Sequence, residues 1–140
     1  MTGAECYCGK RGCIESWCSG PALTAQFEAI TGRKLRPTEI AAAAEAGDRE
    51  AGAMMDRFLD RFARAIATLV NVLDPHAIVM GGGLSNIEAF YTDLPARVEH
   101  YGFNPEGKTV IVRNRHGDSS GVRGAAWLWR AEEIDSGLPG

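Results

Sequence analysis

The four cysteines constrain this chain more than any other feature of its sequence. All of them lie within thirteen residues, at Cys6, Cys8, Cys13 and Cys18, and the rest of the 140-residue chain has none. A disulfide framework would spread cysteines along a small secreted chain, so that they could join distant segments. The clustered arrangement instead favours a local metal site, and free reduced thiols are the alternative.

The spacing inside this cluster is typical of a zinc site. Cys6, Cys8 and Cys13 are separated by one and by four residues, and Gly9 and Gly12 lie between them. Zn²⁺ takes four ligands in a tetrahedron at about 2.0–2.3 Å. Glycines allow a short chain to bend tightly enough for several thiolates to face one ion. We therefore expect these three thiols to converge.

The fourth ligand of such a site is left open by the sequence. Cys18 follows the cluster by five residues, in what we expect to be the start of a helix. His76, His100 and His116 lie far along the chain and are poorly placed by their spacing. The alternatives are therefore Cys18 or a residue upstream of Met1.

Composition and charge narrow the class of protein. The length allows one domain, and 45% hydrophobic with 24% charged residues is an ordinary globular balance. The net charge of −3 gives no basic footprint for nucleic acid. Neither an apolar run of about 18–20 residues nor a signal peptide is visible, so no membrane partner and a cytoplasmic location are expected.

Hydrophobic periodicity and helix-ending residues predict an α/β chain. The clearest pattern is the apolar stripe from Met54 to Leu73, whose members recur at three- and four-residue steps. Asp74-Pro75 should end that helix. The remaining predicted elements are helices over 20–31, 38–47, 85–93 (capped by Ser85 or Asn86) and 122–133, a kink or new helix at Pro95, a buried strand over 77–80, a strand over 109–113, and a loose tail over 134–140.

A run of three glycines follows the first predicted strand. Gly81, Gly82 and Gly83 would let backbone approach a ligand closely, and a following helix N-terminus would present N–H groups to an anion. The run is neither a Walker A loop nor a dinucleotide-binding fingerprint. A tight structural turn is the alternative.

The cysteine segment also resembles a family signature. The run from Cys6 to Glu15 reads C-x-C-G-x-x-G-C-x-E and is followed by Ser19-Gly20. This resembles the ROK family of bacterial sugar kinases and sugar-responsive repressors. The resemblance implies a structural zinc on Cys6, Cys8 and Cys13, with an upstream histidine as fourth ligand and Cys18 as a buried thiol.

The same resemblance implies that Glu15 binds sugar hydroxyls. A carboxylate suits this task, since it accepts hydrogen bonds from adjacent hydroxyls and strengthens them by its charge. Taken without the family, Glu15 is better explained as a first-turn helix residue stabilised by the helix dipole.

Two further segments extend the resemblance over essentially the whole chain. Residues 74–86 look like the adenosine-side glycine segment of ROK kinases, which implies nucleotide binding at Gly81, Gly82 and Gly83. Residues 116–129 look like the C-terminal signature of bacterial fructokinases of the manno(fructo)kinase type. The implied fold is α/β, the C-terminal part of an actin-like, ribonuclease H-like sugar kinase with helices packed on a small sheet. Residues 1–140 then form one C-terminal fragment with a zinc-binding and sugar-contact loop over 1–20, an α/β body over 21–133 and a tail over 134–140.

The function implied is the C-terminal half of an ATP-dependent, fructokinase-like hexose kinase with ATP and Mg²⁺ as co-substrate and ion. The phosphate loop and the general-base aspartate of such kinases have no convincing counterpart, because neither Asp74 nor Asp118 is suitably placed. The chain alone is therefore expected to be inactive. The alternative is the effector domain of a sugar-responsive repressor, in which a separate helix-turn-helix binds DNA. A homodimer is neither supported nor excluded.

Overall fold

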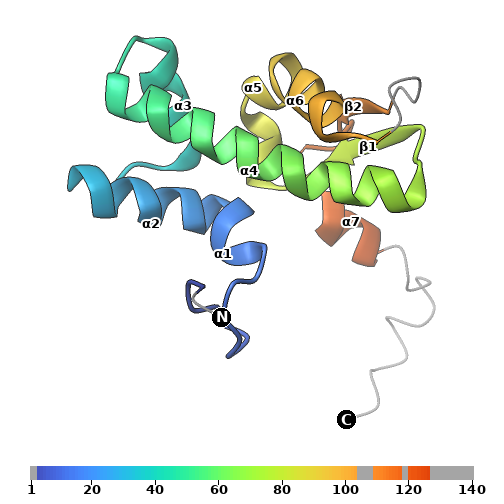
Figure 1. The fold of residues 1–140 in the computed structure, drawn as a ribbon, viewed down its shortest axis with the longest axis horizontal. Helices are drawn as coiled ribbons and strands as arrows, with labels where there is room; N and C mark the ends of the chain where they lie inside the picture. The colour runs from blue at the N-terminus through green and yellow to red at the C-terminus, as the bar shows by residue number, and fades with distance from the viewer. Residues whose placement is uncertain (1–2, 104–108, 118–119, 127–140) are drawn as a thin grey trace.

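The computed structural model describes residues 3–103, 109–117 and 120–126. A long helix, α4, runs across the molecule, and α1, α2, α3 and α6 pack against it (Figure 1). None of the helices formed by the described residues combines the length and apolar character needed to cross a bilayer. The elements are, in chain order, α1 (Glu15–Cys18), α2 (Gly20–Thr31), α3 (Pro37–Glu45), α4 (Arg49–Leu73), β1 (Ala77–Met80), the 3-10 turn η1 (Gly83–Asn86), α5 (Ala89–Thr92), α6 (Leu94–Tyr101), β2 (Val110–Arg113) and α7 (Ser120–Ala126).

Local capping residues explain the ends of α2 and α3. The Ser19 hydroxyl accepts a hydrogen bond from the Ala22 N–H at 3.2 Å, and Gly32 ends α2 in the left-handed region at φ +71°. The Glu39 carboxylate accepts from the Arg36 N–H at 2.7 Å at the start of α3. Both predicted helices are confirmed to within about two residues.

The core is built on the apolar stripe of α4. Phe58 is 1% exposed, and its ring meets those of Phe62 and Phe90 at centroid distances of 6.0 and 6.3 Å. Asp74, at φ +43°, ends the helix before Pro75, as predicted. The helix begins five residues before the predicted stripe, because Asp48 caps its first turn. The other buried residues of α4 are Ala51, Met54, Met55, Leu59, Ala63, Ile66 and Ala67. The prediction is wrong at the end of the stripe, where Leu69 is 52% exposed and Leu73 is 68% exposed.

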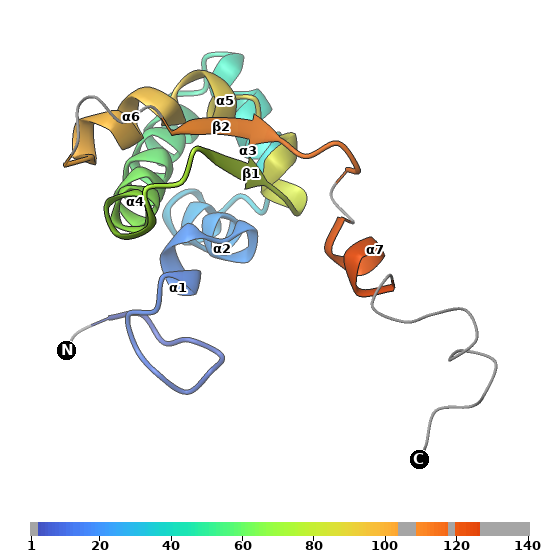
Figure 2. The ribbon, with the colours of Figure 1, turned by 90° about the vertical axis from the view of Figure 1, so that its right-hand side faces the viewer.

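The sheet pairs β1 with β2 in parallel, with Ala77 opposite Val110. Both predicted strands are confirmed, but the prediction that the first is buried is wrong for most of its length. Met80 faces the core at 7% exposure, whereas Val79 is 62% exposed. The sheet of the described residues has two strands, and helices cover only one of its faces, so alternate side chains remain in contact with solvent (Figure 2).

The segment after the glycines departs from the prediction of one helix over 85–93. It forms η1, then the short α5, and then α6 with Pro95 in its first turn. Ser85 lies inside η1 and its hydroxyl donates to the Gly82 carbonyl at 2.7 Å, so it closes a tight turn instead of capping a helix. The final predicted helix is observed as α7, and residues 127–133 and the predicted tail over 134–140 lie outside the described residues.

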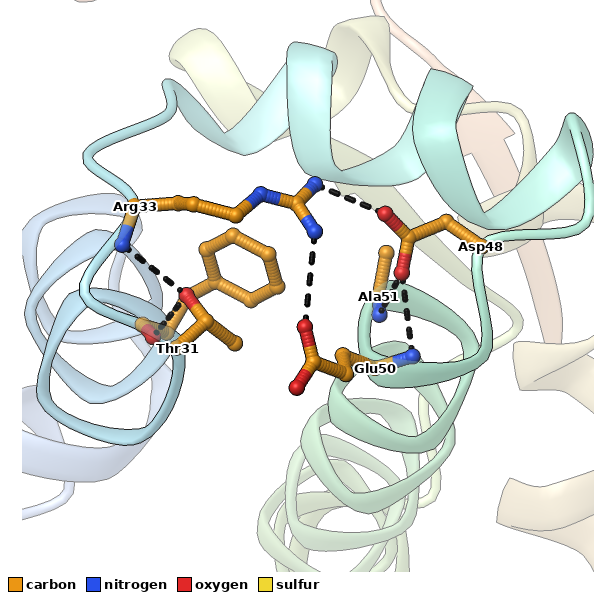
Figure 3. A network of polar contacts seen from close by, with 6 residues as sticks. Thr31, Arg33, Asp48, Glu50 and Ala51 are labelled. Carbon is orange, nitrogen blue, oxygen red and sulfur yellow. Dashed lines mark hydrogen bonds and ion pairs between the residues drawn. The ribbon is translucent and has the colours of Figure 1, made fainter.

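A polar network joins the end of α2 to the start of α4 (Figure 3). Asp48 accepts from the Glu50 and Ala51 N–H groups, each at 3.0 Å, and from the Arg33 guanidinium at 2.7 Å. Arg33 also lies over the Phe27 ring, 5.0 Å from its centroid. The Ala51 N–H and then the Arg33 guanidinium lower the pKa of Asp48 below its usual value, because both stabilise the ionised carboxylate.

We expect this network to make stability depend on pH in the acid range. Because the pKa of folded Asp48 is lowered, its contribution is fully present above about pH 4, the usual aspartate range, and is lost as pH falls through the lowered pKa. At neutral pH, Asp48→Ala should lower the urea midpoint more than Asp48→Asn, since asparagine still caps the helix. The difference between wild type and Asp48→Asn should shrink toward pH 3. Glu99→Gln, on the exposed side of α6, is the control, and an unchanged difference at acid pH would contradict the assignment.

Candidate functional site

The first described segment folds back on itself and brings its cysteines together. Glu5 and Arg11 form an isolated antiparallel bridge, and the Cys6 N–H donates to the Lys10 carbonyl at 2.9 Å. Gly9 and Gly12 have φ values of +80° and +72°, a region that favours glycine, so both glycines are required by the turn. The loop projects below α1 (Figure 2).

Three thiols converge at this turn. The sulfur atoms of Cys6, Cys8 and Cys13 all lie within 4.8 Å of one another, and the Cys8 and Cys13 Sγ atoms are 3.6 Å apart. Ligands at 2.3 Å in a tetrahedron are separated by about 3.8 Å, so this donor set fits Zn²⁺ in both chemistry and spacing. Within the described part of the chain, no histidine and no further cysteine joins the group.

The hydrogen bond between Cys8 and Cys13 shifts the pKa values of the two thiols in opposite directions. The Lys10 N–H, and then the neighbouring thiols, lower the pKa of Cys8 by stabilising its thiolate. The bond to Cys8 is the main cause that raises the pKa of Cys13, to about 11. A cation held by both sulfurs replaces the shared proton, so metal binding releases protons and strengthens as pH rises.

Cys18 does not belong to this cluster. It is the last residue of α1, not the first turn of a longer helix as expected, because Ser19 starts α2 immediately afterwards. Its side chain is half-buried, and this burial raises the pKa of the thiol. The structure thus places Cys18 outside the group of converging thiols, and it is half-buried where the family resemblance implied a buried thiol.

The cysteine turn leads directly into α1, which begins with Glu15. The Ser16 hydroxyl donates to the Cys13 carbonyl at 2.6 Å, and this contact ties α1 to the turn. Glu15 is exposed and lines a hollow of about 550 Å³ together with Cys6, Ser16 and Gln26, which we call the Glu15 hollow. Glu15 therefore occupies a first helical turn and borders a ligand-sized hollow at the same time.

The three glycines follow β1 in an open turn. Gly82 has φ +70°, and a Cβ added at Gly81, Gly82 or Gly83 would meet nothing within 4 Å. The turn conformation requires glycine only at Gly82, while the open space beside all three leaves room for a ligand next to the backbone. Gly83 lines a hollow of about 340 Å³ that also includes Pro21, and Pro21 borders the Glu15 hollow as well.

Asn114 is a site residue that sequence reasoning missed. Its side-chain amide donates to the Met80 carbonyl at 2.9 Å and to the Ser85 hydroxyl at 3.2 Å, which fixes the entry to the glycine turn. Asn114 follows β2 directly, and the carboxyl ends of neighbouring parallel strands share one edge of a sheet. That adjacency is the signal that could have found it.

Comparison with known proteins places the chain in a family. The sequence model of the ROK family matches residues 1–132. The chain belongs to the ROK family. An N-acetyl-D-glucosamine kinase of Vibrio atlanticus (strain LGP32) is 41% identical over 123 residues, which cover 88% of this chain and 41% of that protein. The family predicted from the cysteine signature is thereby confirmed.

Solved ROK structures confirm the fold. A ROK family glucokinase from Streptomyces griseus, crystallised with glucose and AMPPNP, matches with a TM-score of 0.77 and 25% identity over 90% of this chain and 47% of the other. A ROK family transcriptional regulator, a homologue of the E. coli MLC protein, shares the fold at a TM-score of 0.72 and 24% identity, over 90% of this chain and 35% of the regulator. This ROK chain thus spans less than half the length of each of these proteins. None of the three is named as a fructokinase, the type of kinase expected from residues 116–129.

We expect zinc content to follow the three converging thiols. Cys13→Ser should weaken zinc binding by more than the about 10–100-fold that loss of an outer-shell partner costs, because it removes a direct ligand. Cys18→Ser, outside the cluster, is the matched control and should retain as much metal as wild type. Metal analysis after dialysis gives the zinc content, and far-ultraviolet circular dichroism shows whether the helices persist. Equal zinc in both variants would contradict the assignment.

Proposed function

We propose that this chain is the sugar-binding half of an ATP-dependent ROK hexose kinase, with N-acetyl-D-glucosamine as the leading substrate and fructose as the second. The observation that carries the proposal is Glu15, which the cysteine turn holds at the wall of a ligand-sized hollow. The name of the Vibrio atlanticus relative supports the choice of hexose, and the glucose and AMPPNP of the glucokinase structure support a sugar and a nucleotide as ligands.

The composition of the Glu15 hollow suits a sugar. The Glu15 carboxylate is an acceptor for two adjacent hydroxyls, and charge strengthens each hydrogen bond. Gln26 supplies an amide, while Ala22 and Ala25 supply apolar wall against which the C–H face of a ring can lie. A volume of about 550 Å³ lies within the range of small-molecule sites.

The role proposed for Cys6, Cys8 and Cys13 is structural. A zinc ion on these thiols would close the turn that precedes Glu15, and the ion supplies a rigid cross-link, with no part in phosphate chemistry. The division into a zinc and sugar-contact loop over 1–20, a body over 21–133 and a tail over 134–140 belongs to the same proposal.

For the nucleotide, we assign the open turn of Gly81, Gly82 and Gly83. The helix N-terminus expected after these glycines is replaced by the four-residue η1, so what supports the assignment is the free approach to the backbone. ATP and Mg²⁺ would be used by the whole protein.

The repressor alternative keeps the same sugar role for Glu15 and assigns DNA binding to a separate module. The shared fold of the regulator is compatible with it, but no observation on the described residues favours it over the kinase. Dimer formation and a cytoplasmic location stay predictions.

We expect hexose binding to depend on the Glu15 charge. Glu15→Gln should weaken binding of N-acetyl-D-glucosamine by about 10- to 100-fold, since a hydrogen bond to a charged group contributes about 1.5–3 kcal/mol. Glu28→Gln, on α2 but outside the lining of the hollow, is the matched control and should bind as wild type. Calorimetric titration with N-acetyl-D-glucosamine, glucose and fructose ranks the substrates. Equal affinity in wild type and Glu15→Gln would refute the assignment.

We also expect the 140-residue chain to transfer no phosphate by itself. Phosphoryl transfer by such kinases requires a phosphate loop and a general-base aspartate, and neither has a convincing counterpart in this sequence. Incubation with ATP, Mg²⁺ and each hexose should give no sugar phosphate above that of a mock preparation. Clear turnover would show that this half already contains a complete catalytic centre.

A further inference from the structure

A second hollow lies across α1 from the Glu15 hollow, between α1 and α4. Residues 15, 16 and 19 line the first hollow, whereas residues 14, 17 and 18 line this one. Its volume is about 430 Å³, and Arg61 and Arg64 of α4 form its opposite wall. We call it the arginine hollow. None of the described residues that line it carries a carboxylate.

Arg61 is a half-buried cation whose partners are all neutral. Its guanidinium carbon lies 4.7 Å from the centroid of the Trp17 ring, and its Nη1 donates to the Gln26 side-chain oxygen at 2.6 Å. Among the residues that the structure describes, no carboxylate lies within ion-pair distance of it. Arg61 therefore keeps a positive charge that no described carboxylate offsets, and its guanidinium has more N–H donors than these contacts use, so the site favours an anionic ligand.

Arg64 adds a second guanidinium to the same wall. It pairs with Asp60 at 3.1 Å and lies over the Tyr101 ring, 4.8 Å from its centroid, and these contacts hold the side chain in place. An arginine has five N–H donors, so donors remain for a ligand. Burial raises the pKa of Cys18, which keeps that lining thiol neutral and adds no competing negative charge.

We propose that the arginine hollow binds the phosphate group of a small phosphate ester. A phosphate monoester carries about −1.5 to −2 charges at pH 7, and its oxygens accept paired hydrogen bonds from a guanidinium. Arg61 supplies a positive charge that no described carboxylate offsets, and Arg64, which shares its charge with Asp60, adds further donors. Ile14, Trp17 and Ala65 give the rest of the hollow apolar walls, and its volume has room for a sugar-sized group attached to the phosphate.

One side chain connects this hollow to the Glu15 hollow. Gln26 lines the Glu15 hollow and accepts the hydrogen bond of Arg61, and its own amide reaches the Ser16 carbonyl at 3.5 Å. A phosphate that draws Arg61 toward itself weakens the hold on Gln26, so phosphate-ester binding lowers the affinity for hexose. This link rests on the proposed function, whereas the phosphate site itself does not. By linkage, hexose lowers the affinity for the phosphate ester by the same factor.

Calorimetric titration of the 140-residue chain tests the phosphate site without any kinase assay. The probes are glucose 6-phosphate, inorganic phosphate and uncharged glucose. We expect saturable binding of glucose 6-phosphate with a Kd of about 1 mM or lower. Arg61→Gln should weaken it at least tenfold and Arg64→Gln several-fold. Arg57→Gln is the matched control on the same helix, since Arg57 contacts the Ala53 carbonyl and lies outside the hollow lining.

The variants separate charge from packing. Arg61→Lys keeps the positive charge but loses the paired N–H donors of the guanidinium, so it should bind glucose 6-phosphate more tightly than Arg61→Gln does. Circular dichroism checks that each variant folds. If inorganic phosphate binds as tightly as glucose 6-phosphate, the phosphate group alone is the ligand, which supports the site. No saturable binding to wild type, or equal binding to wild type, Arg61→Gln and Arg64→Gln, would overturn it.

A second titration isolates the link between the hollows. Hexose affinity is measured with and without saturating glucose 6-phosphate, and the affinity should fall by about 2- to 10-fold when the ester is present. An unchanged affinity would overturn the link through Gln26 while leaving the phosphate site intact. If hexose does not bind at all, the proposed function fails, and the titration with glucose 6-phosphate alone still decides the arginine hollow.

Discussion

The apolar stripe of α4 is the constraint on which the rest of this structure depends. Burial of residues such as Phe58 and Ile66 on one side of a single long helix gives α2, α3 and α6 a common surface to pack against. The same helix carries Arg61 on a different side, where it meets Trp17 of α1. The packing of the core and the position of the candidate site are therefore set by one element, because α1 also packs against α4.

Elements with strong local signals could be predicted from the sequence, and those shaped by their surroundings could not. Ser19 and Gly32 mark the ends of α2 through contacts with residues only a few positions away, so the sequence alone predicts their roles. The burial of β1 depends on which elements cover the sheet, and an apolar run in the sequence does not indicate those elements. The prediction of a helix cap at Ser85 was wrong for a similar reason. A serine hydroxyl often caps a helix, but the Ser85 hydroxyl donates to the Gly82 carbonyl and closes a turn.

The residues of the candidate site also fall into those that the sequence predicts to come together and those that only the structure brings together. The convergence of Cys6, Cys8 and Cys13 follows from spacing and glycines within one short loop, so the sequence predicted which residues come together. The contact of Arg61 with Gln26 joins residues 35 positions apart, on helices whose relative placement no local pattern encodes. The role of Asn114 at the glycine turn likewise requires the register of β1 with β2. Long-range polar contacts are the part of the site that only the structure supplies.

The shortness of α1 has a consequence for how the molecule responds to heat. Four residues form a single turn, which is far below the length at which a helix is stable on its own. Its shape is imposed from outside, by the cysteine turn at one end and by α4 at one side. Such a segment melts locally at temperatures that leave the main core intact. Because α1 forms a wall of both hollows, warming should disrupt the two hollows together, at temperatures well below those at which the long helices unfold.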